Sequence, residues 1–257
     1  MLARQRHQRI LDEVARAGAV KIADLVEEFG VSDMTIRRDI TELAARGLVD
    51  RVHGGAARPS MASVHEPGFA TKAAQQVAAK EAIAASVATL VAEGSSLGIS
   101  AGTTTHLVAR KLLDTPELTV VTNSLPVADE LHANRRIEQT VLLTGGTRTP
   151  SDALVGPLAI AALRGIHLDL LILGVHGMSA AAGLTCPNLL ETQTNRALID
   201  ASRRIVVVAD HTKWGVVALQ TIARLTEVDV LVTDDGLATA AREEIAGMVG
   251  ELMVART

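Results

Sequence analysis

The sequence predicts an α/β protein with two domains, a small one at the amino terminus and a larger one built on a mostly parallel sheet. The first 57 residues contain three short amphipathic segments followed by a glycine-tipped hairpin pattern. From residue 72 onward, β-type runs alternate with helical patterns, which is typical of parallel sheets with crossover helices. With 257 residues and 48% hydrophobic composition, the chain can bury a core in each domain.

The small domain is organised around residues 31–42, with the sequence VSDMTIRRDITE. Ser32 can cap a helix start and Gly47 can end the helix, so the pattern predicts a helix between them. At 100° per residue, one face of this helix is apolar and the other is polar. The apolar face carries Ile36, Ile40, Leu43 and Ala44, and the face that could reach a DNA groove carries Met34, Arg37, Arg38 and Thr41.

Two amphipathic patterns precede this helix and a hairpin pattern follows it. Apolar residues at helical spacing predict helices around residues 10–15 and 22–29, and Gly30 supplies the tight turn of a helix-turn-helix. Residues 48–55 then predict a short hairpin that ends in two glycines. Such a hairpin is a wing, and it carries Arg51, His53 and Gly54.

The runs RQRHQRILDEV, IADLVEEFGVSDMTIRRDITELAARGLV and RVHGGA fill most of this domain. They resemble the amino-terminal winged helix-turn-helix of the DeoR family of bacterial transcriptional regulators. The resemblance implies that residues 32–41 enter the major groove of double-stranded DNA, while the wing contacts the DNA backbone. The DNA-binding residues that it implies are Ser32, Met34, Thr35, Arg37, Arg38, Thr41, Arg51, His53 and Gly54.

Charge and composition narrow the choice of nucleic acid. The net charge is -4, and residues 1–58 hold ten basic against nine acidic residues, so DNA binding is inferred from where the arginines fall. Aromatic residues make up 1% of the chain, which argues against base stacking on single strands or RNA. The arginines expected to face one DNA duplex are Arg4, Arg6, Arg9, Arg37, Arg38 and Arg51.

Other whole-chain features indicate a cytoplasmic protein without a cofactor. Cys186 is the single cysteine, so neither an intrachain disulfide nor a thiolate metal cluster can form within the chain. The charged start MLARQRHQRI is followed by no apolar signal core, and no run of about 18 uncharged apolar residues occurs. A metal-dependent sensor is an alternative prompted by the eight histidines, although no two of them stand at metal-ligand spacing on an expected helix.

The larger domain is expected over residues 72–257, after a linker at 58–71 that is rich in proline, glycine and small polar residues. A long alanine-rich helix is expected first, over residues 72–93. The strands that follow are expected at 97–100, 118–122, 140–144, 169–173, 205–209, 228–233 and near Leu252, with helices after Thr103 and Ser124, from Pro157, over 189–202 and from Gly236.

Glycine and polar residues follow several of these strands, where parallel sheets bind their ligands. In ISAGTTTHL, Gly102 allows close backbone approach and residues 103–105 begin a helix, a geometry that attracts phosphate. Each motif alone could be a turn, but several at strand ends favour a pocket. Four further motifs follow, and Trp214 of the last one could close the pocket. They hold Asn123 with Ser124, Gly145 with Gly146, the joined set of Gly174, His176, Gly177, Glu191 and Arg196, and Asp210 with Lys213 and Trp214.

These five segments resemble, in order and spacing, the carboxy-terminal effector domain of the same family, which is related in fold to ribose-5-phosphate isomerase. The resemblance implies a phosphorylated sugar as effector. The chain departs from the family where Ser100 replaces a frequent aspartate and where Gln193 and Asn195 replace a glutamate and a lysine, which leaves the effector's identity open. The effector-binding residues implied are Gly102, Thr103, Thr104, Thr105, Asn123, Ser124, Gly145, Gly146, Gly174, Glu191 and Lys213.

The sequence therefore predicts a DNA-binding transcriptional regulator, most often a repressor in this family, of a carbohydrate-metabolism operon under control of a phosphorylated sugar. The alternative is an aldose-ketose phosphate isomerase with Glu191 or Asp169 as the base and Lys213 polarising the carbonyl. A single winged domain contacts few bases, so a homodimer or homotetramer assembled through the larger domain is expected. The particular sugar phosphate, the operon and the direction of the response stay open.

Overall fold

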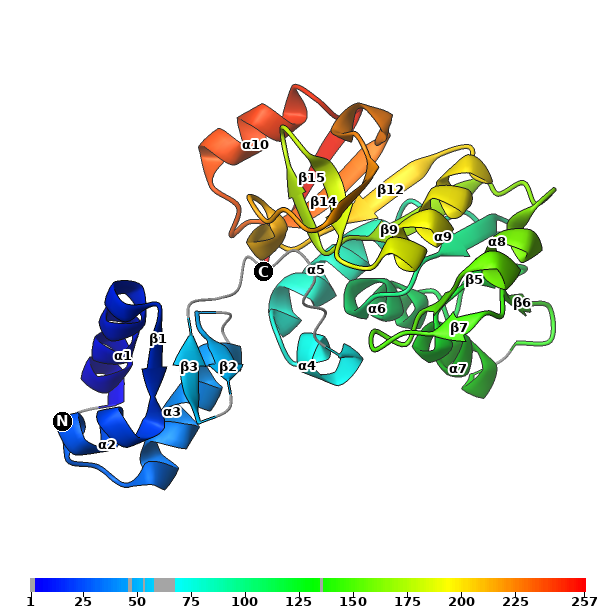
Figure 1. Ribbon diagram of the computed structural model, residues 1–257. Helices are drawn as coiled ribbons and strands as arrows, with labels where there is room; N and C mark the ends of the chain where they lie inside the picture. Colours follow the sequence, from blue (N-terminus) through cyan, green and yellow to red (C-terminus); the bar gives the residue numbers. More distant parts are fainter. Residues whose placement is uncertain (1–2, 46–47, 53, 58–67, 135) are drawn as a thin grey trace. The chain divides into compact units, whose positions relative to one another are not determined.

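A computed structural model describes the chain except for residues 1–2, 46–47, 53, 58–67 and 135 (Figure 1). The chain divides into two compact units, Met1–Ala62 and Ser63–Thr257. Within the described residues, no helix has the length and apolar character needed to cross a membrane.

The amino-terminal unit combines three helices with a small antiparallel sheet of strand order β1-β3-β2 (Figure 1). Strands β2 and β3 form the predicted wing, with Gly54 at its tip at φ 76°. Strand β1 was not predicted, because three residues are too few to show a period. The bounds are α1 Ala3–Ala17, β1 Ala19–Lys21, α2 Ile22–Phe29, α3 Asp33–Ala45, β2 Asp50–Val52 and β3 Gly55–Ala57.

The core of this unit is formed by the apolar faces of its three helices. Ile10 of α1, Leu25 of α2 and Ile36 of α3 are all buried in one cluster. Helix α2 ends at Gly30, whose φ of 65° is left-handed and whose N–H donates to the Val26 carbonyl, as the predicted tight turn requires. The helix predicted between Ser32 and Gly47 is α3, and Gly47 itself lies outside the described residues.

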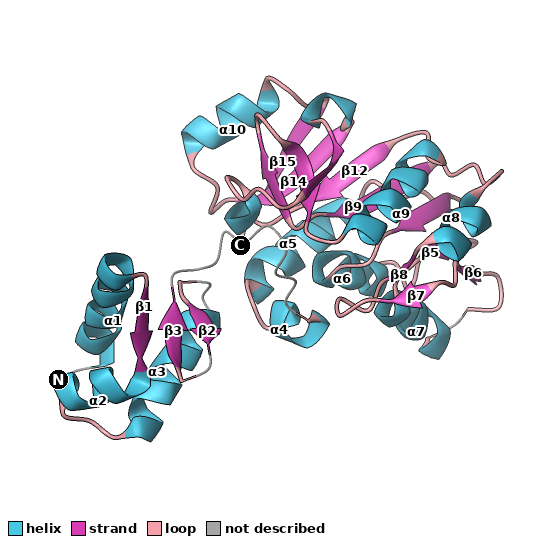
Figure 2. Ribbon diagram, viewed as in Figure 1, coloured by secondary structure: helices cyan, strands magenta, loops and turns pink. Residues whose placement is uncertain are grey.

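The carboxy-terminal unit is built on a parallel sheet with the strand order β15-β14-β12-β9-β4-β5-β6 (Figure 2). Every pairing within this sheet is parallel. These are the seven strands that the sequence predicted, displaced by at most two residues at each defined end. Their bounds are β4 Ser96–Ile99, β5 Thr119–Thr122, β6 Thr140–Leu143, β9 Leu170–Gly174, β12 Ile205–Val208, β14 Val230–Asp234 and β15 Glu251–Ala255.

Helices cover both faces of this sheet, so the unit has two apolar clusters. Alternate residues of β9 divide between them: Leu171 packs in one cluster and Ile172 in the other. The first cluster is covered by α8, α9 and α10, and the second by α5, α6 and α7. The helix bounds are α4 Phe69–Ala73, α5 Val77–Ala88, α6 Thr103–Lys111, α7 Leu125–Ala133, α8 Pro157–Leu163, α9 Leu189–Asp200 and α10 Thr239–Ala246.

Two predictions about this unit need correction. The long helix expected over residues 72–93 is two helices, α4 and α5, separated at Gln76, which adopts a left-handed φ of 49°. Helix α4 begins at Phe69, inside the segment expected to be linker. The sequence also missed two small antiparallel sheets, formed by β7 Thr147–Arg148 with β8 Leu154–Val155, and by β10 Gly177–Ser179, β11 Gly183–Cys186 and β13 Gln220–Ala223.

Candidate functional sites

The outward face of α3 is polar and open to solvent, as predicted. Met34 is 74% exposed, and Arg37, Arg38 and Thr41 are exposed beside it. Ser32 caps the helix, since its Oγ accepts from the Thr35 N–H at 3.3 Å. The helix therefore starts with a fixed geometry and presents its arginines on one side.

Both arginines of this face are paired with carboxylates one turn away on the same helix. Arg37 Nη2 lies 3.3 Å from Asp33 Oδ2, and Arg38 Nε lies 3.0 Å from Glu42 Oε1. Exposed pairs of this kind contribute little to stability, because water screens the two charges. A DNA phosphate can replace these carboxylates at small cost.

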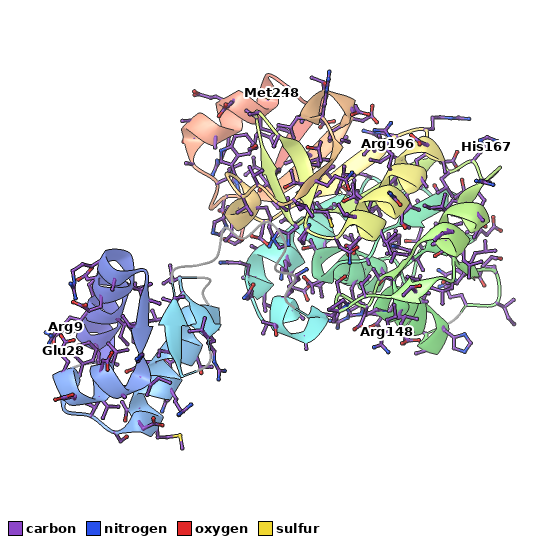
Figure 3. All side chains as sticks on the ribbon, in the orientation of Figure 1. Arg9, Glu28, Arg148, His167, Arg196 and Met248 are labelled. Atoms are coloured by element: carbon purple, nitrogen blue, oxygen red, sulfur yellow. The ribbon has the colours of Figure 1, made fainter. Side chains whose placement is uncertain are left out.

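The structure corrects the expected set of DNA-facing arginines. Arg6 is buried, because its guanidinium packs against the carboxylate of Asp39 between α1 and α3. Arg9 pairs with Glu28, beside which it lies in Figure 3, and its guanidinium stacks 4.7 Å from the centre of the Phe29 ring. In the wing, Arg51 and Gly54 are exposed, and His53 lies outside the described residues. The side chain of Arg4, in α1, also lies outside them.

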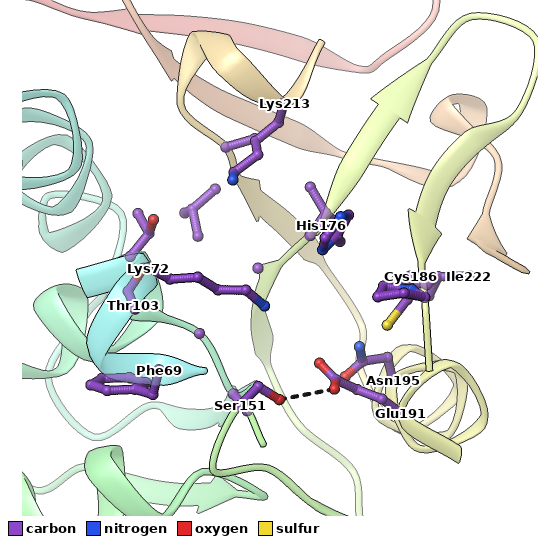
Figure 4. A pocket seen from close by; sticks show the side chains of 18 of the residues that line it. Phe69, Lys72, Thr103, Ser151, His176, Cys186, Glu191, Asn195, Lys213 and Ile222 are labelled. Carbon is purple, nitrogen blue, oxygen red and sulfur yellow. Dashed lines mark hydrogen bonds between the residues drawn. The ribbon is translucent and has the colours of Figure 1, made fainter. Parts of the chain in front are cut away.

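In the carboxy-terminal unit, a pocket opens at the carboxyl ends of β4, β9 and β12 (Figure 4). Ala101 and Gly102 follow β4, Gly174 ends β9, and Ala209 follows β12. Its cavity volume is about 110 Å³, several times what a single water needs. Parallel sheets bind ligands at this edge, so the pocket is the candidate ligand site.

One wall of the pocket suits an anion. Gly102 and Thr103 stand at the start of α6, which has no acidic residue in its first turn and no side-chain hydrogen bond at its cap. A helix start attracts negative charge through its amides and its dipole. Lys72, Lys80 and Lys213 also line this pocket, and in Figure 4 the Lys72 side chain extends towards its middle.

Lys80 is the most buried of these lysines, at 4% exposure, and its Nζ donates to the Lys72 carbonyl at 2.5 Å. Burial lowers the pKa of Lys80 to about 8, the Asp210 carboxylate opposes this, and the charges of Lys213 and Lys72 lower the pKa further. Burial is the main cause, because it penalises the charged ammonium. A bound anion would favour the charged form of Lys80.

The opposite wall is formed by α9 and a loop. Glu191 and Asn195 stand one helical turn apart on α9 and lie side by side in Figure 4. The Ser151 hydroxyl donates to Glu191 Oε2 at 3.1 Å. Asn195 is buried, and no described residue hydrogen-bonds to its Oδ1.

The structure brings six of the eleven expected effector-binding residues into the pocket lining and leaves five outside it. Asn123 lies behind the wall: its Oδ1 accepts from the Ala101 N–H at 2.9 Å and its Nδ2 donates to the Leu154 carbonyl. It holds the loop that precedes α6. The six that line the pocket are Gly102, Thr103, Thr104, Gly174, Glu191 and Lys213.

The other four residues outside the lining have structural partners of their own. Thr105 donates its hydroxyl to the Gly102 carbonyl at 2.9 Å, and Ser124 caps α7 by accepting from the Val127 N–H. Gly145 and Gly146 shape the turn before β7, both at positive φ. A Cβ on Gly146 would lie 2.5 Å from the Val155 carbonyl oxygen, so glycine is required there by packing.

Several residues that line the pocket were not predicted from the sequence. Phe69 comes from the segment expected to be linker, and Lys72 and Gln75 come from the start of the expected alanine-rich helix. Ser151 comes from a loop before β8. By contrast, Trp214 was expected to close the pocket, but it packs against the apolar cluster under α9 and does not line the pocket.

Of the two carboxylates expected as the base of an isomerase, the structure places only one at the pocket. Asp169 lies at the amino end of β9, where its Oδ2 accepts from the Ser96 N–H at 3.0 Å, so it is at the opposite edge of the sheet from the pocket. Glu191 does line the pocket. Within the described part of the chain, no three histidine, cysteine, aspartate or glutamate side chains gather as a metal site would require.

Comparison with known proteins gives the family of both units. Residues 6–62 match the DeoR-like helix-turn-helix domain, and residues 75–235 match the DeoR C terminal sensor domain. This chain belongs to the DeoR family of transcriptional regulators. The glycerol-3-phosphate regulon repressor of Escherichia coli (strain K12) is 39% identical over 231 residues, which cover 90% of each chain.

Another DeoR-type relative is the HTH-type transcriptional regulator GlpR of Haloferax volcanii, 37% identical over 246 residues and 95% of each chain. A structure of ribose 5-phosphate isomerase A from Methanocaldococcus jannaschii is 15% identical, with a TM-score of 0.39 over 52% of this chain and 53% of that one. The curated relatives are named as a transcriptional regulator and a regulon repressor, and this chain matches the helix-turn-helix domain. The protein is therefore a DNA-binding regulator, and the isomerase alternative is not favoured.

Proposed function

We propose that this DeoR-family regulator represses a carbohydrate-metabolism operon and that a phosphorylated sugar or sugar derivative, bound in the pocket, controls its affinity for operator DNA. The observation that carries the proposal is that one wall of the pocket is suited to binding an anion. The start of α6 and the ammonium groups of Lys72, Lys80 and Lys213 line a single cavity. A phosphate monoester carries the charge and the acceptor oxygens that such a wall binds.

Control of DNA binding is supported by the position of α4 in the sequence. Helix α4 follows directly on residues 58–67, which connect the two units, and it supplies Phe69 and Lys72 to the pocket. The edge of the Phe69 ring also packs on the His106 side chain of α6, with 5.7 Å between ring centroids. A ligand that contacts α4 and α6 together can therefore act on the segment that leads to the DNA-binding unit.

On the DNA side, we propose that α3 enters the major groove and that the wing contacts the phosphate backbone. The contacts from α3 and its cap would be made by Ser32, Met34, Thr35, Arg37, Arg38 and Thr41. Because a single unit contacts few bases, the protein would act as a homodimer or homotetramer on paired half-sites. Its place of action would be the cytoplasm, where bacterial operator DNA is found.

The test is an electrophoretic mobility shift with DNA from the region upstream of the protein's own gene. The ligands are glycerol 3-phosphate, ribose 5-phosphate and fructose 6-phosphate, and the dephosphorylated compounds serve as controls. We expect a retarded band that weakens with salt and that changes with at least one phosphorylated compound but with none of the controls. No band at low salt, or equal responses to phosphorylated and dephosphorylated compounds, would contradict the proposal.

A matched pair of lysine variants ties this response to the pocket. Lys213→Met removes a pocket ammonium, whereas Lys111→Met removes one from the exposed far end of α6, where Lys111 pairs with Glu81 at 3.1 Å. Lys213→Met should weaken the response to the phosphorylated compound at least tenfold, and Lys111→Met should leave it unchanged. Equal effects of the two substitutions would mean that general charge, and not the pocket, is responsible.

A further inference from the structure

Asn195 presents an unsatisfied oxygen in the wall of the pocket. The side chain is 3% exposed and lines the cavity from α9, yet no described residue donates a hydrogen bond to its Oδ1. Two other buried side-chain oxygens in the described chain lack a partner, those of Gln139 and Thr233, but neither residue lines the pocket. Asn195 therefore combines a buried, unmet acceptor with a place in the pocket lining.

A buried acceptor without a partner costs stability, because it has lost its water and gained nothing in exchange. An apolar side chain of similar size at position 195 would avoid this cost. The cost is recovered if a bound molecule supplies the missing donor. The oxygen of Asn195 therefore indicates a ligand group that can donate a hydrogen bond.

The neighbouring groups define that donor further. The carboxylate of Glu191 stands one turn before Asn195 on the same side of α9, so this wall presents acceptor oxygens and a negative charge. A ligand carboxylate or second phosphate has no proton to donate at neutral pH and would be repelled. A hydroxyl group donates a hydrogen bond and carries no charge, so it matches this wall.

The two walls therefore differ in chemistry. In Figure 4, Thr103 and Lys72 lie on one side of the pocket, and Glu191 and Asn195 lie on the other. We propose that Asn195 is a specificity-determining residue that accepts a hydrogen bond from a hydroxyl on the carbon chain of the phosphorylated ligand. This inference rests on the proposed function and adds one contact to the effector.

The test measures binding to the full chain by calorimetric titration and by thermal shift. The probes are glycerol 3-phosphate, ribose 5-phosphate and fructose 6-phosphate, with n-propyl phosphate and inorganic phosphate as probes that lack carbon-bound hydroxyls. The variant is Asn195→Leu. The matched control is Gln193→Leu, at an exposed position of the same helix that the structure places outside the pocket lining.

We expect wild-type protein to bind at least one hydroxylated ester more tightly than n-propyl phosphate. Asn195→Leu should weaken that binding about tenfold, which corresponds to about 1.4 kcal/mol. Affinity for n-propyl phosphate and inorganic phosphate should stay within about twofold, as expected if the phosphate wall is unchanged. The ligand-free Asn195→Leu protein should melt at the same temperature as wild type or higher, because an unsatisfied group has been removed. Gln193→Leu should change none of the affinities.

Three results would overturn the inference. In the first, Asn195→Leu binds the hydroxylated ester as tightly as wild type. In the second, it melts well below wild type and loses affinity for every probe equally, which would make Asn195 a structural residue. In the third, wild-type protein binds all phosphate probes equally, which removes the hydroxyl preference but leaves the phosphate site of the proposed function intact. If no phosphate probe binds and none of them changes the affinity for operator DNA, the proposed function fails as well.

Discussion

Arg6 of α1 and Asp39 of α3 form a buried ion pair behind the DNA-facing helix, with 2.9 Å between Arg6 Nη2 and Asp39 Oδ1. The side chains are 10% and 5% exposed. Nε2 of His7 lies 3.1 Å from the same carboxylate oxygen. Burial would raise the pKa of Asp39, but the hydrogen bonds from Arg6 and His7 outweigh burial and hold this pKa below its ordinary value. The pair therefore ties α1 to the inner face of α3.

Asp39→Asn should destabilise the amino-terminal unit by about 3–5 kcal/mol, because it removes the negative charge that Asp39 supplies to the buried Arg6 guanidinium. The chain's single tryptophan, Trp214, belongs to the other unit, so its fluorescence reports that unit alone. In urea unfolding, we expect the Asp39→Asn protein to lose its helical circular dichroism at a lower urea concentration than wild type. The unfolding midpoint measured by Trp214 fluorescence should be unchanged. Glu42→Gln, at an exposed partner of Arg38, is the control and should change stability by less than about 0.5 kcal/mol. Coincident shifts in both signals would contradict the assignment.

The same pair predicts how the amino-terminal unit responds to acid. Since the pKa of Asp39 is lowered on folding, its stabilising contribution is present above the unfolded pKa and is lost as the pH falls through the lowered folded value. Wild-type helical circular dichroism should therefore show a loss of stability below about pH 4. The Asp39→Asn protein should lack this part of the acid dependence. Identical acid dependence of the two proteins would show that Asp39 does not contribute.

Removing Arg37 or Arg38 should weaken binding to operator DNA and flatten its salt dependence. Each phosphate contact that is lost should reduce the slope of log affinity against log salt by about 0.9. A contact to a base edge should instead relax the sequence preference at one position. Arg16→Ala, at an exposed arginine that pairs with Glu13 on α1, is the matched control. Fluorescence anisotropy over a salt series, with the operator and with single-base variants of it, measures both effects. An unchanged slope together with an unchanged sequence preference in both variants would contradict a role for α3 in DNA contact.

The elements with a strong local pattern could be predicted from the sequence, and the small ones could not. The four-residue or longer apolar runs of the parallel sheet, such as β9, showed β-type composition. Helix α4 spans five residues and the strands β7 and β8 span two each, so no period could develop within them. These elements form through long-range contacts, such as the hydrogen bond from the Phe69 N–H to the Pro150 carbonyl.

The difference between local patterns and long-range contacts also explains which pocket residues could be predicted from the sequence. Residues directly after a strand, such as Gly102 and Gly174, could be placed at one edge of the sheet by topology alone. Asn123 also follows a strand, yet its side chain turns into the loop behind the wall, a direction that topology does not determine. Asn195 could have been expected beside Glu191, because residues four apart share a helix face.

Gly145 and Gly146 should differ sharply in their tolerance of alanine. Gly145 has a φ of 71° and no neighbouring atom within 4 Å of an added Cβ, so Gly145→Ala should cost only about 1–2 kcal/mol of backbone strain. Gly146 has a φ of 119°, and its Cβ would meet the Val155 carbonyl, so Gly146→Ala should cost more than about 3 kcal/mol. Urea unfolding followed by Trp214 fluorescence measures both. Equal costs would show that the contact with β8 does not constrain this turn.

Lys80→Met should raise the stability of the ligand-free protein at pH 7 while weakening its binding of inorganic phosphate. Burial lowers the pKa of Lys80 from 10.5 to about 8, so the charged form costs the folded state roughly 3 kcal/mol well below pH 8. This exceeds the loss of its hydrogen bond to the Lys72 carbonyl, about 1.5 kcal/mol.

The sign of the pH dependence follows from the same lowered pKa. Between pH 8 and 10.5 the unfolded chain holds the Lys80 proton more tightly than the folded chain does, so wild-type stability should rise with pH across this window. Lys80→Met should melt a few degrees higher than wild type at pH 7 and should lack that rise. Phosphate binding to wild type should weaken as the pH rises above about 8, because the bound anion favours charged Lys80. Lys111→Met is the control for general charge, and a lower melting temperature for Lys80→Met at pH 7 would contradict the argument.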